Sequence, residues 1–102
     1  MAENKETIEQ KIAQWKKKWP KGVYKYESED GKTAYLHAPD RAVIGAAVVE
    51  AHGDPIRHNE FVLNNCWIEG DECLRNEDRY FLSLQVFLDS MVETVRGELK
   101  KL

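Results

Sequence analysis

The sequence predicts an α+β fold in which an N-terminal helix and a β-hairpin precede three helices, the last of them long. Three observations support this prediction: helical spacing of apolar residues over residues 3–19, alternation of β-forming residues around Asp30-Gly31, and a helical stripe that starts near Glu77. At 102 residues the chain has the usual length of one domain, so we expect residues 1–102 to fold as a single unit.

The first predicted element is a helix in a basic N-terminal segment, residues 1–20, which we expect at the periphery of the domain. Apolar side chains recur there at the spacing of one helical face: Ile8, Ile12, Trp15 and Trp19. Pro20 ends the pattern because proline lacks a backbone N–H. Two tryptophans on one helix must be covered, either by their own domain or by a partner. Trp15 and Trp19 are therefore candidate partner-binding residues.

The body of the domain, residues 23–102, is predicted to begin with a β-hairpin. Residues on both sides of Asp30-Gly31 alternate and are rich in β-formers, and Asp-Gly between such segments is a strong turn signal. Tyr24 and Tyr26 share one strand face, and we expect them to meet Tyr35 across the ladder. A hairpin alone is marginally stable, so it needs a helix beneath it or a third strand from another chain.

Two shorter helices are predicted next. Asp40 is the expected N-cap of the first, and Gly53 ends it. Asp54-Pro55 is typical of a cap followed by proline in the first helical turn, and the second helix is predicted to carry Trp67 and to break near Gly70.

The final helix is predicted over residues 77–102, with Asn76 as its N-cap. Acidic residues in its first turn and lysines in its last turn match the helix dipole. The first half is broadly apolar and should be buried, whereas the charged second half should project. The candidate partner-binding residues of that second half are Met91, Val92, Val95, Leu99 and Leu102. The alternative is that this strip and the tryptophan face pack on each other, within one chain or across a homo-oligomer.

Several classes of protein are disfavoured by composition. No segment approaches the roughly 20 apolar residues that span a bilayer, and the N-terminus lacks the apolar run of about 7–15 residues found in secretory signals. The two cysteines imply no disulfide framework. We therefore expect a cytoplasmic protein with reduced thiols and no membrane partner.

Enzymatic and metal chemistry also find little support, and we expect no catalytic residue, metal site or cofactor. His52, His58, Cys66 and Cys73 offer soft ligands, but their spacing lacks the short ligand pairs typical of zinc sites. Acidic residues gather at turns, where helix capping and solubility explain them, and no phosphate-binding glycine motif is present.

A small nucleic-acid-binding regulatory protein of a mobile element is the alternative function. The predicted helices 40–52 and 55–68, which are connected at Gly53, resemble a helix-turn-helix motif. However, the second helix carries few cations, and the positive charge lies instead in residues 1–26, which sum to +4. A solvated helix face explains that charge as well as nucleic acid does, and nucleic acid is the less favoured partner.

One segment resembles a known family. The runs Ala34-Tyr35-Leu36-His37-Ala38-Pro39-Asp40-Arg41 and Asn64-Asn65-Cys66-Trp67-Ile68-Glu69-Gly70-Asp71-Glu72, together with Asn59-Glu60, Phe81-Leu82-Ser83 and Glu98-Leu99-Lys100-Lys101-Leu102, are similar to small phage and prophage tail assembly chaperones. The resemblance covers roughly residues 23–102. The lysine-rich helix before it has no counterpart in the pattern.

The resemblance implies a non-enzymatic interaction protein in the bacterial host cytoplasm. Proteins of this kind bind the tape measure and tail tube proteins during tail morphogenesis and keep the tape measure soluble. The family offers no catalytic residues to transfer to this chain. A chaperone for helical segments needs exposed apolar strips within a charged surface, which is why the two strips above are the candidate sites.

Overall fold

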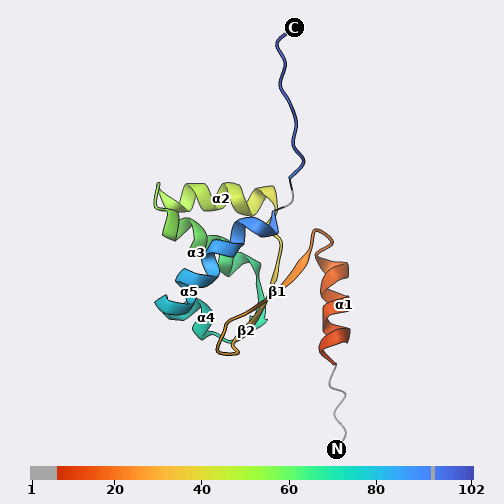
Figure 1. The fold of residues 1–102 in the computed structure, drawn as a ribbon, viewed down its shortest axis with the longest axis vertical. Helices are drawn as coiled ribbons and strands as arrows, with labels where there is room; N and C mark the ends of the chain where they lie inside the picture. The colour runs from red at the N-terminus through yellow and green to blue at the C-terminus, as the bar shows by residue number, and fades with distance from the viewer. Residues whose placement is uncertain (1–6, 93) are drawn as a thin grey trace, which may run out of the picture.

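The computed structural model describes residues 7–92 and 94–102, and it confirms the predicted α+β fold. Its elements are, in chain order, α1 (Ile8–Lys18), β1 (Val23–Glu27), β2 (Thr33–His37), α2 (Arg41–Ala51), α3 (Pro55–Cys66), β3 (Trp67–Gly70), α4 (Cys73–Asn76), α5 (Asp78–Leu84) and the 3-10 helix η1 (Gln85–Met91). The sheet lies between α1 on one side and the remaining helices on the other (Figure 1). No described helix is long and apolar enough to cross a membrane.

Helix α1 begins at a capping box. The Thr7 side chain accepts a hydrogen bond from the backbone N–H of Gln10, and the Gln10 side chain accepts one from the N–H of Thr7. This arrangement satisfies two backbone donors of the first turn. The helix ends at Lys18, just before Pro20, as predicted. Residues 3–6 of the predicted helix lie outside the described residues.

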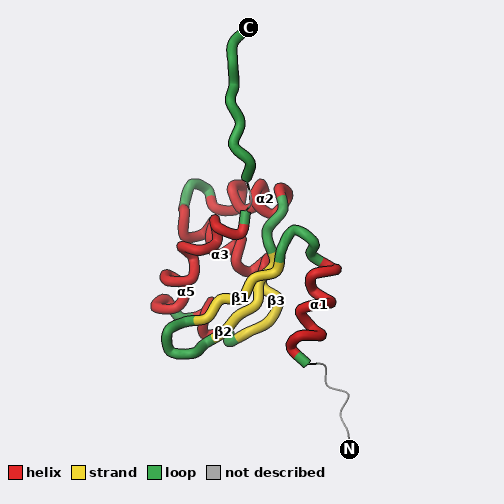
Figure 2. Tube along the Cα trace, turned by 45° about the vertical axis from the view of Figure 1, so that its right-hand side comes forward, coloured by secondary structure: helices red, strands yellow, loops and turns green. Residues whose placement is uncertain are grey.

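The sheet is antiparallel with the strand order β1-β2-β3, and Figure 2 shows its three strands side by side. Tyr24 lies opposite Leu36, whereas Tyr35 lies opposite Lys25. Directly opposite residues share a face, so Tyr24 and Tyr26 face the core and Tyr35 faces α1. The prediction that Tyr35 meets the β1 tyrosines was wrong, because it depended on the register, which the five-residue connection between the strands sets.

The third strand comes from the same chain. The second helix was predicted to carry Trp67, but α3 ends at Cys66 and the next four residues pair with β2. The apolar residues keep a helical spacing through Trp67. The backbone of residues 67–70 nevertheless forms its hydrogen bonds with the free edge of β2, and it is therefore a strand. Gly70 permits the close approach, since a Cβ atom there would lie 2.5 Å from the Cα of Ala34.

The boundaries of α2 and the start of α3 are those predicted from the sequence. The side chains of Asp40 and Asp54 each accept a hydrogen bond of 2.9 Å from a backbone N–H of the following first turn. His52 and Gly53 adopt positive φ values of 48° and 86°, which reverse the chain between the two helices.

The C-terminal helix is shorter than predicted. Helical structure runs through α5 and η1 from Asp78 to Met91, and Glu77 rather than Asn76 occupies the cap position. Val92 and residues 94–102 form neither helix nor strand, so the predicted helix over 77–102 was wrong in its second half. A short helix is marginal in water without a packed face, and residues 94–102 are all exposed.

The hydrophobic core lies between the inner face of the sheet and the helices α2 to η1. Its buried side chains include Ala34, Leu36, Ala47, Val62, Leu63, Cys66, Leu74, Phe81, Leu84, Leu88 and Met91. The first half of the predicted C-terminal helix buries Tyr80, Phe81, Leu84, Leu88 and Met91, as expected. The prediction that the whole half is buried was wrong for Leu82, Val86 and Phe87, which are 49%, 67% and 53% exposed because they lie on the side of the helix away from the core. Helix α1 contributes no fully buried residue and packs outside this core.

Candidate functional site

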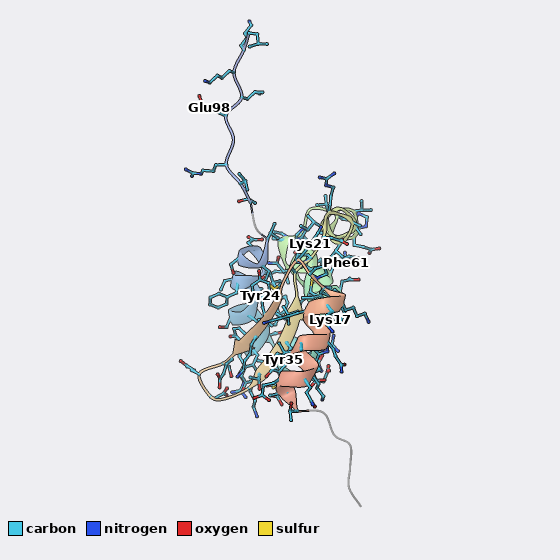
Figure 3. All side chains as sticks on the ribbon, turned by 90° about the vertical axis from the view of Figure 1, so that its right-hand side faces the viewer. Lys17, Lys21, Tyr24, Tyr35, Phe61 and Glu98 are labelled. Atoms are coloured by element: carbon cyan, nitrogen blue, oxygen red, sulfur yellow. The ribbon has the colours of Figure 1, made fainter. Side chains whose placement is uncertain are left out.

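The predicted partner-binding residues lie in three separate places. The first is the tryptophan face of α1, which packs on the outer face of the sheet (Figure 3). The rings of Trp15 and Tyr35 lie 5.3 Å apart, and Trp19 stacks on His37 with a separation of 4.6 Å and nearly parallel planes. Both tryptophans are half-buried, so the domain itself covers much of this face.

The second place is the end of η1. Met91 is only 4% exposed and belongs to the core, so its side chain offers little surface to a partner. Val92 is 36% exposed and lines a small hollow beside Pro39 and Ile44. The sequence did not distinguish these two neighbours, because their burial depends on where the helix ends.

The third place is the extended segment of residues 94–102, which projects away from the body of the protein (Figure 1). Val95, Leu99 and Leu102 are 98%, 101% and 115% exposed. Aliphatic side chains this exposed are costly in water, because their burial would be favourable by about 1.5–3 kcal/mol each. These three residues are the largest fully solvated apolar side chains among the described residues.

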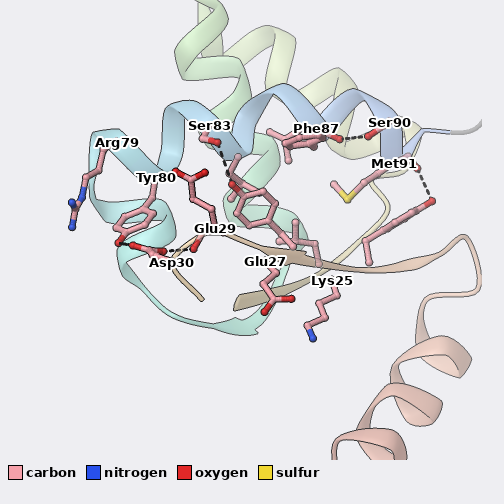
Figure 4. A pocket seen from close by; sticks show the side chains of 16 residues that line it. Lys25, Glu27, Glu29, Asp30, Arg79, Tyr80, Ser83, Phe87, Ser90 and Met91 are labelled. Atoms are coloured by element: carbon pink, nitrogen blue, oxygen red, sulfur yellow. Dashed lines mark hydrogen bonds between the residues drawn. The ribbon is translucent and has the colours of Figure 1, made fainter. Parts of the chain in front are cut away.

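The structure also contains a groove that the sequence analysis missed. It has a volume of about 800 Å³ and lies between β1 and the helical segment α5–η1 (Figure 4). The accessible part of its apolar lining consists of Tyr24, Tyr26 and Phe87. Four buried side chains, each at most 4% exposed, form its floor: Leu36, Leu84, Leu88 and Met91. The groove joins residues about 60 positions apart in the sequence, so only the packing of α5–η1 against β1 creates it.

Aromatic residues connect the two sides of this groove. The rings of Tyr26 and Phe87 lie 5.9 Å apart, and Phe87 is 53% exposed. The hydroxyls of Tyr26 and Ser83 are 3.2 Å apart, and the Tyr24 hydroxyl donates to the backbone carbonyl of Met91 at 3.5 Å. These contacts bridge the groove and tie β1 to the helical segment α5–η1.

One end of the groove is acidic. Asp30 accepts hydrogen bonds from the hydroxyls of Ser28 and Tyr80, and these two bonds hold its pKa below the usual value. The same carboxylate raises the pKa of Tyr80, because it accepts the phenolic proton. Asp30 therefore stays ionised at neutral pH, close to the exposed carboxylate of Glu29.

The residues considered for metal or thiol chemistry do not converge. Within residues 7–92 and 94–102, no group of three or more His, Cys, Asp or Glu side chains is placed to hold a metal ion. Cys66 is fully buried, and burial, with a smaller effect of the Asp40 carboxylate, raises its pKa to about 12. A thiol with that pKa is protonated and inert at neutral pH.

The surface thus offers two features suited to binding a polypeptide, the groove beside β1 and the apolar segment 94–102. Their side chains are aliphatic and aromatic with charged residues around them, which is the composition of protein-binding surfaces. Comparisons of the chain with known protein families, with curated proteins and with solved structures found no match.

Proposed function

We propose that this protein is a non-enzymatic interaction protein of the phage tail assembly chaperone type, which binds a tape measure or tail tube protein during tail morphogenesis. The observation that carries the proposal is the full exposure of Val95, Leu99 and Leu102 on a projecting segment. The resemblance of residues 23–102 to such chaperones is its second support.

The spacing of the exposed residues indicates how the segment would bind. Val92, Val95, Leu99 and Leu102 follow the i, i+3, i+7, i+10 pattern of one helical face. An isolated segment of this length does not hold a helix in water, but it can fold against an amphipathic helix of a partner. The gain from burying the four side chains is offset by the cost of ordering the backbone, so we expect reversible binding.

Charge around the apolar face suits a chaperone. Arg96, Lys100 and Lys101 flank it and are opposed by Glu98. On a helix Arg96 and Glu98 would border the apolar face, and Lys100 and Lys101 would lie on the other side, where they would keep a loaded complex soluble. Reversible capture with a solubilising outer face is what a long, aggregation-prone partner needs while it awaits assembly.

The proposal is tested by co-expression with a tape measure protein, the partner that it names. The triple variant Val95→Ser, Leu99→Ser, Leu102→Ser keeps the charge and should lose both the complex and the solubility of the partner. The matched control Val95→Ile, Leu99→Met, Leu102→Met keeps the apolar surface and should retain both. Equal co-purification of the partner with the two triple variants would refute the proposed role of this segment.

A further inference from the structure

Strand β1 has a free edge whose orientation follows from the hairpin. The Ala38 N–H donates to the Gly22 carbonyl at 2.9 Å, and the Ser28 N–H donates to the Lys32 carbonyl at 2.8 Å. Hydrogen-bonded pairs alternate with non-bonded pairs in an antiparallel ladder, so the even-numbered residues of β1 direct their backbone groups at β2.

The odd-numbered residues of β1 therefore direct their backbone groups outward. The N–H and C=O groups of Val23, Lys25 and Glu27 point away from β2, and within residues 7–92 and 94–102 no strand pairs with this side of β1. Consecutive residues of β1 and its turn line the groove, so the free edge runs along it. The groove thus provides unpaired backbone groups next to an aromatic wall, which is the arrangement used for strand addition.

The charges along this edge favour a basic occupant. Glu27, Glu29 and Asp30 are exposed, and none of them takes part in an ion pair among the described residues. Two lysines lie beside these three carboxylates: Lys25, and Lys32, whose charge acts on Asp30. Arg79 is engaged with Glu77 at 3.3 Å. The edge therefore carries a net negative charge.

The segment 94–102 has the complementary properties. It is extended and fully exposed, and it carries three cations against the single carboxylate of Glu98. As a strand it would place Arg96, Glu98 and Lys100 on one face and Leu99 on the other. Nine extended residues span about 30 Å, which is more than enough to run along β1, whose five residues span about 17 Å.

We propose that the groove and the free edge of β1 bind the segment 94–102 of a second copy of this chain, as a fourth strand of the sheet. In the register that fits the charges, Glu98 lies beside Lys25 and Leu99 enters the aromatic side of the groove. Either Arg96 or Lys100 then lies beside Glu27, in the antiparallel or parallel sense respectively. Reciprocal exchange of the two segments closes a two-fold dimer.

The position of the segment 94–102 indicates that it binds the groove of a second copy and not the groove of its own chain. It leaves the body at Met91, next to Tyr24 at one end of the groove, and runs away from it (Figure 1). The protein reaches 69 Å along its longest axis, against 32 and 24 Å for the other two. Lying in its own groove would require the chain to reverse direction immediately after Met91.

This inference is independent of the proposed function, since it concerns the purified protein without any tail protein. It also gives the exposed segment a place to lie when no partner is bound. A partner that takes the segment would compete with the dimer, so the two uses of residues 94–102 exclude each other.

The test is sedimentation equilibrium of the full chain between about 1 μM and about 1 mM, where the unaltered protein should show a monomer–dimer equilibrium. Lys25→Pro removes an outward N–H and no bond within the hairpin. It should weaken the dimer about a hundredfold, because each of two exchanges loses a hydrogen bond worth up to about tenfold. The control Lys25→Gln keeps the N–H and should change the affinity by only about threefold.

A second variant tests the segment itself. Leu99→Asp damages the segment but leaves the groove intact, so it should weaken the dimer as Lys25→Pro does, whereas docking within one chain would leave the unaltered protein and every variant monomeric. A protein that is monomeric throughout this range, or a dimer that either Lys25→Pro or Leu99→Asp leaves unchanged, would overturn the proposal.

Discussion

Replacement of Gly70 by alanine tests whether β3 packs on β2 as the structure shows. An added Cβ would lie 2.5 Å from both the Cα of Ala34 and the carbonyl oxygen of Thr33. Both are backbone atoms of the central strand, so they cannot move aside as a flexible side chain could. Overpacking costs about 1–3 kcal/mol, and the positive φ of 157° adds to it. We therefore expect Gly70→Ala to lower the free energy of unfolding by about 3–4 kcal/mol.

Alanine substitutions at two other glycines separate the cost of a steric clash from the cost of an unfavourable backbone conformation. Gly53 has a φ of 86° but nothing within 4 Å of an added Cβ, so Gly53→Ala should cost only the left-handed conformation, about 1–2 kcal/mol. Gly45 lies inside α2 with open space around it, and Gly45→Ala should stabilise the protein by about 0.5–1 kcal/mol.

The assay is urea unfolding at 25 °C followed by circular dichroism and tryptophan fluorescence. In a domain of this size each kcal/mol corresponds to about 4–8 °C in Tm, so thermal unfolding should give the same order of stability. The expected order is Gly45→Ala, unaltered protein, Gly53→Ala, Gly70→Ala. If Gly70→Ala were no less stable than Gly53→Ala, the pairing of β3 with β2 would be refuted.

Three further predictions concern the thiols and α1. The pKa of Cys66 is raised above its ordinary value to about 12, so the folded state holds the thiol proton more tightly than the unfolded state does. The free energy of unfolding should therefore fall as pH rises from about 9 towards 12. Cys66→Ala should remove that part of the pH dependence. At pH 8 a thiol reagent should modify the half-buried Cys73 rapidly and Cys66 only when the protein unfolds, and rapid modification of both would contradict the packing. The double variant Trp15→Ala, Trp19→Ala should speed amide exchange throughout α1 while β2 and α3 stay protected, since α1 is held by ring contacts outside the core. Unchanged exchange in α1 would show that other contacts hold it.

The sequence by itself determined the local elements of this protein. Capping residues such as Asp40 and Asp54, the stop at Pro20 and the alternation around Asp30-Gly31 each act within a few residues, so their consequences can be read without knowing the fold. The burial of Phe81, Leu84 and Leu88 was also predictable, because they share one helical face that needs a core, whereas the apolar residues beside that face are exposed.

Only the tertiary structure decided the features that depend on distant residues. Trp67 continues a helical pattern, but the free edge of β2 draws it into a strand. The helix predicted to reach Leu102 ends at Met91, because no described surface covers the later apolar residues. The groove exists because α5–η1 packs against β1, and neither segment carries a local signal for it. Pairing and burial are relations between separate segments, whereas a sequence pattern reports only on neighbours along the chain.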